Sequence, residues 1–70
     1  MTLLQATEGR EYTVQRIETN DDGLNAFLFS LGCYVGQPIT VISRRRGCCI
    51  VSIKDGRYTM DDRLAGAICV

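Results

Sequence analysis

The sequence predicts one small, mainly β domain: a barrel of about five strands, with one short α-helix after the first strand and a helical turn before the last. Three observations lead to this prediction. Seventy residues suffice for a single domain, so residues 1–70 form one unit. Short runs of β-forming residues alternate with glycine-containing turns over most of the chain. Only one segment carries a strong helical spacing of apolar residues.

The first strand is expected over residues 11–18, where β-forming residues mix with charged ones, as in a half-exposed strand. Its alternation of apolar and polar residues slips between Val14 and Ile17. We therefore expect a bulge or an early end of the strand at that point.

A helix is expected next, because residues 19–22 collect side chains that cap helix N-termini. Apolar residues then follow at positions i, i+3, i+4 and i+7, namely Leu24, Phe27, Leu28 and Leu31. This spacing lines one face of a helix and places all four on the core. Gly32 stands where a left-handed C-terminal cap belongs.

The middle of the chain predicts a three-stranded meander. Residues 39–43 read as a strand, residues 44–47 as its turn and residues 48–54 as the returning strand. Asp55 and Gly56 are a strong signal for a two-residue hairpin turn, because both tolerate a positive φ, and they lead into a third strand over residues 57–60.

The last elements are a helical turn and a short strand. Asp61 can cap a turn over residues 63–65, and Gly66 can end it. The final strand, residues 67–70, can pair with the first. Pairing of the two ends would close the barrel.

Composition argues against catalysis and against broad electrostatic binding. Eight basic residues balance eight acidic ones, so the chain presents no strong field to nucleic acid or to an anionic membrane. Without histidine there is no ordinary Ser-His or Cys-His pair, and without a Gly-Lys dipeptide there is no phosphate-binding lysine. The start of the chain lacks the basic and apolar regions of a signal peptide, which favours a cytoplasmic location.

The four cysteines, Cys33, Cys48, Cys49 and Cys69, are expected to be free thiols that act as small hydrophobes. No C-x-x-C pair and no histidine are present, so a four-cysteine metal site is the weaker interpretation. Neighbouring cysteines in a strand point to opposite faces, which separates Cys48 from Cys49. Asp21-Asp22 and Asp61-Asp62 could bind a divalent metal, but helix capping explains both pairs better. No cofactor is expected.

Arg44, Arg45 and Arg46 are the only cluster of charge. The preferred interpretation is a solvated turn that discourages edge-to-edge pairing of strands. A docking patch for an acidic partner surface comes second. Contact with RNA phosphates comes third, because the chain has only three tyrosines and two phenylalanines for stacking on bases, and Phe27 is assigned to the core.

Residues 28–42 resemble the helix-to-strand signature of the FeoA family, in which a leucine helix ends in Leu-Gly, a short turn ends in Gly and a strand follows. The early Gly9 and the closing Leu64, Ala65, Ile68 and Val70 extend the resemblance over the whole chain. Two positions depart from the pattern, since the family usually has proline at Val35 and a larger aliphatic residue at Cys33.

The resemblance implies an SH3-like barrel of about five strands that serves as a non-catalytic cytosolic accessory of ferrous iron uptake. Its implied partner is the cytosolic portion of FeoB, a GTPase-coupled membrane transporter, and transition-metal binding is a trait of the family. The same module occurs as the C-terminal domain of iron-dependent repressors. A metal-sensing regulatory role and small-barrel RNA binding are therefore the alternatives. The sequence leaves self-association open.

The partner surface is expected at the turn after the helix, formed by Cys33, Tyr34, Val35 and Gly36, with the three arginines as a second contact. A plain solvent turn would favour Asn, Asp or Ser over a tyrosine and a valine. In the alternative interpretation, which we weight equally, Tyr34 and Val35 only cover the end of the barrel.

Overall fold

Nine short elements build the fold in a computed structural model that describes residues 1–70. In chain order they are the 3₁₀ helix η1 (Leu3–Gln5), β1 (Glu11–Thr13), β2 (Arg16–Ile17), α1 (Asp22–Ser30), β3 (Pro38–Arg45), β4 (Cys48–Ile53), β5 (Gly56–Asp61), α2 (Asp62–Ala67) and β6 (Ile68–Cys69). The mainly β class that the sequence predicts is confirmed.

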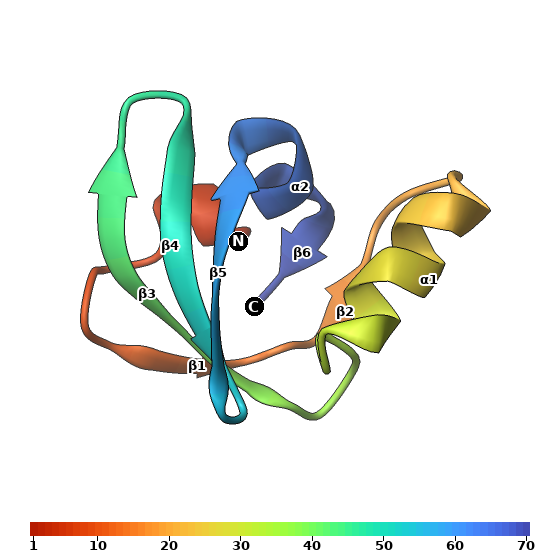
Figure 1. Ribbon diagram of the computed structural model, residues 1–70, viewed down its shortest axis with the longest axis horizontal. Coiled ribbons are helices and arrows are strands. Elements are labelled where there is room, and N and C mark those ends of the chain that lie inside the picture. The colour runs from red at the N-terminus through yellow and green to blue at the C-terminus, as the bar shows by residue number, and fades with distance from the viewer.

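The strands form two antiparallel sheets (Figure 1). The larger sheet has the order β1-β3-β4-β5, and the smaller one pairs β2 with β6. The predicted meander corresponds to β3, β4 and β5, and a shift of register in β3 between Val41 and Ser43 leaves Ile42 as a bulge. Two sheets of this size enclose a single core between them.

The predicted interruption of the first strand is confirmed and is the point where the chain changes sheets. The amide of Val14 donates to the carbonyl of Gln37 at 2.9 Å, next to β3, whereas the amide of Gln15 donates to Cys69 in β6 at 2.7 Å. Residues before this point therefore pair with β3 and residues after it pair with the last strand.

The expected pairing of the two chain ends is present, but it does not close the barrel. Ile17 lies opposite Ile68 in the small sheet, and Val70 donates its amide to the carbonyl of Met1 at 2.9 Å. No strand joins β5 to the small sheet, so β5 keeps a free edge. The correction matters because an edge strand has unpaired backbone groups.

The core consists mainly of aliphatic side chains, with Met60 and three cysteines among the buried residues. Its largest members come from η1, α1 and both sheets, including Ile68 of β6, with Val14 at the change of sheets, and no polar side chain is buried. Cys33, Cys49 and Cys69 are buried and Cys48 is half-buried, so the thiols of Cys48 and Cys49 lie on opposite faces of β4 as expected.

Both helices begin as the sequence predicts. Asp21 Oδ1 accepts the amide of Leu24 at 3.1 Å at the start of α1, and Asp61 Oδ1 accepts the amide of Leu64 at 2.8 Å at the start of α2. The helical turn expected over residues 63–65 is longer, because α2 continues through Gly66 to Ala67. Gly66 has no positive φ and does not end the helix.

The end of α1 is fixed by Gly32, which has a φ of 89°. The amide of Cys33 donates to Leu28 O at 2.9 Å and the amide of Gly32 donates to Phe29 O at 3.0 Å. This is the Schellman arrangement, which usually comes with an apolar contact between the two outer residues, here the buried Leu28 and Cys33.

The core face of α1 differs from the expectation at one residue. Leu28 is buried and Leu24 and Leu31 are half-buried, but Phe27 is 50% exposed. Figure 1 shows why, because α1 projects from the sheets instead of lying flat on one of them. Only a narrow stripe of the helix meets the core.

Both hairpin turns are shifted from their predicted positions. The first is the pair Arg46-Gly47, with Gly47 at a φ of 78°. The second is Lys54-Asp55, because Ile53 pairs with Gly56 and Lys54 adopts a positive φ of 52°. Gly56 is therefore not a turn residue, and a Cβ at this position would collide with the ring of Tyr58.

Arg44 belongs to β3 and not to a solvated turn, which corrects the expectation for one of the three arginines. Its Nη2 donates to the carbonyls of Leu3 and Ala6, each at 2.8 Å. Its backbone amide donates to Glu8 Oε2 at 2.9 Å. Arg44 therefore ties η1 to the main sheet, and only Arg45 and Arg46 are exposed.

We predict that Arg44→Ala lowers the free energy of unfolding by about 1.5–3 kcal/mol, because hydrogen bonds from a charged donor contribute on this scale. The control Arg45→Ala should change it by less than about 0.5 kcal/mol, as expected for an exposed side chain. Urea unfolding of the three proteins measures both values. Equal stability of the two variants would contradict the assigned role of Arg44.

Candidate partner-binding site

The turn between α1 and β3 is held by backbone bonds to Val14. The amide of Gly36 donates to Val14 O at 2.9 Å, and the amide of Gln37 donates to Tyr34 O at 3.1 Å. Gly36 has a φ of 92° with no atom within 4 Å of an added Cβ, so this glycine serves the backbone conformation alone. The turn is thus a fixed platform for its side chains.

The predicted segment 33–36 divides between the core and the surface. Cys33 is 1% exposed and packs in the core, so its side chain is not available to a partner. Tyr34 is half-buried, and Val35 is 64% exposed. Val35 therefore lies mostly in solvent, so the interpretation that both residues act as a lid over the barrel end is wrong for Val35.

Phe29 joins Tyr34 and Val35, although the sequence analysis did not single it out. Its side chain is 66% exposed, and its ring centroid lies 5.0 Å from that of Tyr34. The available signal was its position one residue after Leu28, off the apolar stripe of the helix, where a large apolar side chain has no core to enter. We call Phe29, Tyr34 and Val35 the helix-turn patch.

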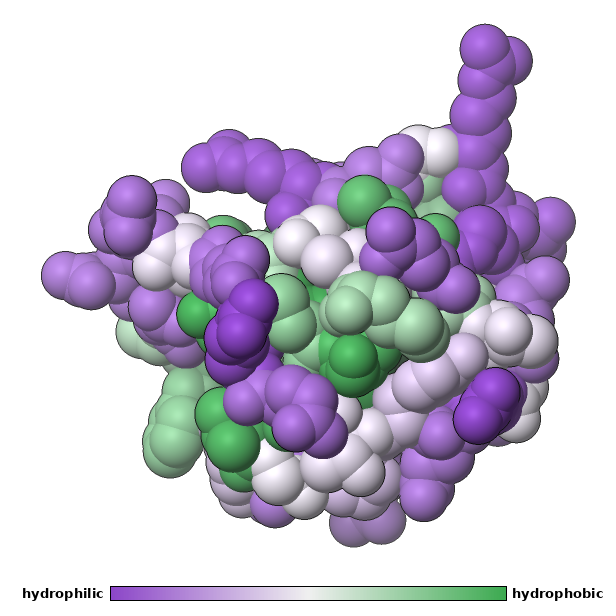
Figure 2. Space-filling view, turned by 180° about the vertical axis from the view of Figure 1, so that it is seen from behind, coloured by the Kyte–Doolittle hydropathy of each residue, from purple (hydrophilic) through white to green (hydrophobic).

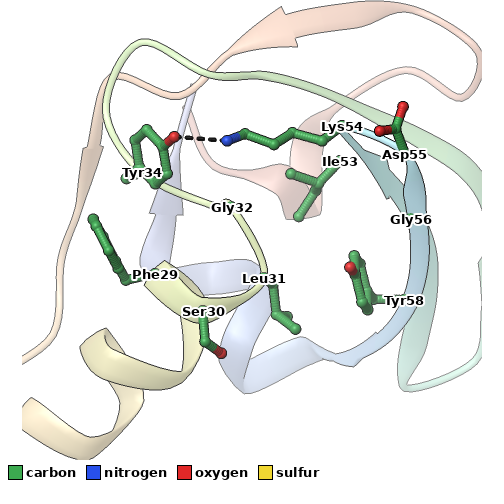
Figure 3. Close-up of a pocket in the computed structure, with 10 residues that line it drawn as sticks. All are labelled: Phe29, Ser30, Leu31, Gly32, Tyr34, Ile53, Lys54, Asp55, Gly56 and Tyr58. Atoms are coloured by element: carbon green, nitrogen blue, oxygen red, sulfur yellow. Dashed lines mark hydrogen bonds between the residues drawn. The ribbon is translucent and has the colours of Figure 1, made fainter.

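An open hollow lies on each side of the helix-turn patch. The hollow on the β2 side has a volume of about 560 Å³ and is lined mostly by apolar side chains, among them Ile17, Ala26 and Val35. The other has a volume of about 570 Å³ and lies between the end of α1 and the β4-β5 hairpin (Figure 3). Seen from behind, apolar residues reach the surface beside α1 and in the middle of that face, within a largely hydrophilic rim (Figure 2).

Lys54 brings a positive charge to the second hollow. Its Nζ donates to the Tyr34 hydroxyl at 2.8 Å and lies 5.0 Å from the centroid of the Tyr34 ring (Figure 3). The stem of Lys54 passes over Gly32, where an added Cβ would lie 3.1 Å from Lys54 Cδ. The only ion pairs of the chain are Arg16 with Glu18 and Arg63 with Asp21, so no carboxylate neutralises Lys54.

The structure does not bring the arginines to the helix-turn patch. Arg45 and Arg46 lie at the tip of the β3-β4 hairpin, whereas the patch lies at the other end of the molecule beside α1 (Figure 1). Two separate predicted contacts therefore remain, and Arg44 is committed to the fold.

The cysteines do not form a cluster suited to metal binding. No group of three or more acidic, cysteine or histidine side chains comes together in the chain. Burial raises the pKa of Cys33 to about 11 and also raises the pKa of Cys49. Such thiols stay protonated at neutral pH, whereas metal binding needs the thiolate.

The FeoA domain family matches the chain over residues 1–70. The chain belongs to the FeoA family. The family is non-catalytic, and its domain is linked to ferrous iron transport. Among curated proteins, none matches this FeoA domain.

Solved structures confirm the SH3-like fold of the FeoA domain. A manganese-dependent transcriptional repressor superposes with a TM-score of 0.88 at 26% identity and covers 97% of this chain, which spans only 39% of the repressor. The zinc complex of FeoA from Stenotrophomonas maltophilia, described as a prokaryotic SH3 domain protein, has a TM-score of 0.86 at 16% identity, with 99% of this chain and 87% of that one covered. An iron uptake regulatory protein, also a FeoA, has a TM-score of 0.81 at 26% identity, with 97% and 92% covered.

None of the helices in this FeoA domain has the length and apolar character needed to span a membrane.

We predict that Gly32→Ala destabilises the domain more than Gly36→Ala. Both glycines have a φ near 90°, which costs alanine about 1–2 kcal/mol. Only at Gly32 does the new Cβ also meet Lys54 Cδ, at 3.1 Å, and Ile53 Cγ2, at 3.5 Å. Urea unfolding measures the difference, which should shrink in a Lys54→Ala background. An unchanged difference in that background would show that Lys54 does not rest on Gly32.

We also predict that Cys48 reacts first with iodoacetamide at pH 8. Cys48 is half-buried, whereas Cys33 is buried and its pKa of about 11 leaves about one thiolate in a thousand at this pH. Mass spectrometry of the alkylated peptides gives the order, and all four cysteines should react in denaturant. Fast alkylation of Cys33 in the native protein would contradict its burial.

Proposed function

We propose that this FeoA domain is a cytosolic accessory of ferrous iron uptake that binds the cytosolic portion of a FeoB-type transporter through the helix-turn patch. The observation that carries the proposal is the exposure of Phe29 and Val35 beside the half-buried ring of Tyr34. The binding regulates the transporter, and the chemistry of GTP hydrolysis belongs to the partner.

The physical case rests on rigidity and apolar area. Aromatic anchors often dominate the energetics of interfaces, and they are most effective when they are ordered before binding. Tyr34 is held by the Phe29 ring, by Lys54 and by a turn bonded to Val14, so little side-chain freedom is lost on binding. The apolar hollow beside β2 offers room for a side chain of the partner.

A regulatory module is the second candidate function. It is favoured by the likeness to a manganese-dependent transcriptional repressor. The matched region is 39% of that repressor, so a domain with this fold forms one part of a larger regulatory protein there. RNA binding has less support from the structure than from the sequence. Arg44 is engaged with Leu3 and Ala6, which leaves two exposed arginines at the β3-β4 tip, far from the exposed aromatic rings.

We predict that the double variant Phe29→Ser, Val35→Ser loses affinity for the FeoB-type transporter by tenfold or more, because truncation of central apolar residues commonly costs at least 1–2 kcal/mol of binding. Its thermal stability should stay close to that of the wild type, since both side chains are exposed. Binding is measured by titration with the intact, detergent-solubilised transporter of the same cell.

The control is Ile42→Ser, which removes another exposed aliphatic side chain, 37% exposed, from the bulge in β3. This variant should bind as the wild type does. Equal loss in both variants, or normal binding by the double variant, would rule out the helix-turn patch. Absence of any complex with the wild type would rule out the accessory function itself.

A further inference from the structure

The free edge of β5 carries backbone groups that no part of the chain uses. In antiparallel pairs, every second residue exchanges its hydrogen bonds with the neighbouring strand. Asp62 donates its amide to Gly47 O at 3.1 Å. Counting every second residue back from Asp62, the residues of β5 that are hydrogen-bonded to β4 are Met60, Tyr58 and Gly56. The amides and carbonyls of Arg57 and Thr59 therefore point away from β4, and both residues are exposed.

The hollow of Figure 3 lies on the core-facing side of this edge. Gly56 and Tyr58, two of its lining residues, belong to the face of β5 that packs against the interior, where Met60 is buried. In a sheet, directly opposite residues have their side chains on the same face. A strand added to β5 would thus direct the side chains opposite Gly56 and Tyr58 into the hollow.

The hollow offers hydrogen-bond donors that are not paired with a carboxylate. Lys54 has three donors and spends one on Tyr34. The Tyr34 hydroxyl accepts that bond, so its own proton is free to donate. Asp55 also lines the hollow, but it forms no ion pair with Lys54, and its carboxylate is directed away from Tyr34 (Figure 3). An uncompensated ammonium beside a free hydroxyl is complementary to a carboxylate.

We propose that β5 takes up an extended segment of the partner protein as an additional strand, and that an aspartate or glutamate of this segment binds Lys54 and Tyr34 in the hollow. Main-chain bonds to Arg57 and Thr59 supply the pairing, and the acidic side chain supplies the selectivity. The inference rests on the proposed function, because Tyr34 belongs to both surfaces. It adds the chemistry of the bound segment.

A second copy of this chain fits the edge less well. If β5 paired with β5 of a second copy, the side chains of that copy on the face of the hollow would be those of its Gly56, Tyr58 and Met60. None of these residues is acidic, so Lys54 would stay unpaired. The charge of the hollow therefore favours a partner segment.

The test is hydrogen exchange of this protein alone and in complex with the intact, detergent-solubilised FeoB-type transporter. The chain is recovered after timed exchange and its amides are read by NMR. In the free protein, the Arg57 and Thr59 amides should exchange fast while those of Tyr58 and Met60 are protected. In the complex, Arg57 and Thr59 should become protected as well.

Two variants examine the parts of the proposal separately. Lys54→Gln keeps most of the side-chain length and removes the charge, and should weaken binding roughly tenfold to hundredfold. Thr59→Pro removes an outward amide and should weaken binding without loss of a bond to β4. Its matched control is Thr13→Pro in β1, the opposite edge strand, where Thr13 pairs with Pro38 and its amide also points away from the sheet. This control should bind normally.

The outcomes separate the two proposals. A transporter complex in which Arg57 and Thr59 still exchange fast, or one that Lys54→Gln leaves unchanged, overturns the added strand with its acidic residue and leaves the accessory function standing. Protection of these amides by a second copy, without the transporter, also overturns it. No complex with the wild-type protein overturns both proposals. Because the exchange readout uses the wild type, the proposal stays falsifiable even if Thr59→Pro fails to fold.

Discussion

The backbone bonds of Val14 and Gln15 hold the whole structure together. Val14 donates to Gln37 and accepts from Gly36, so it fixes the β3 end of the turn after α1, and Gln15 donates to Cys69 in the other sheet. Two adjacent residues thereby set the position of the main sheet, the small sheet and the helix-turn patch. A domain of this size has few buried contacts, so such shared bonds replace the larger core of a longer chain.

This arrangement explains why α1 can project and still be ordered. Its N-terminus is capped by Asp21, and its C-terminus is locked by Gly32 and by the buried pair of Leu28 and Cys33. The helix is thus anchored most firmly at its last turn, with Leu24 as a further, half-buried contact near its start. Aromatic side chains off the buried stripe are left in solvent, which supplies the apolar surface assigned to the partner.

Much of the fold follows from local rules that can be read in the sequence. The caps at Asp21 and Asp61, the left-handed Gly32 and the break after Val14 depend on neighbours a few residues away. The misread positions depend on how the elements are packed and paired. Arg44 looks like a turn residue until η1 is placed beside it, and Gly56 looks like a turn glycine until Tyr58 is placed over it. The candidate site was located by Tyr34 and Val35, but Phe29 and Lys54 joined it only through the orientation of α1 and the true position of the hairpin turn.

At Lys54, the residue that is best for the stability of the fold differs from the residue that is best for binding the partner. A left-handed conformation costs a side chain with a Cβ about 1–2 kcal/mol, and glycine would adopt it freely. Glycine at this turn would therefore favour the hairpin while it removed the only ammonium in the hollow. Lys54 is consequently a position where selection for a more heat-resistant domain and selection for a better binder would choose opposite residues.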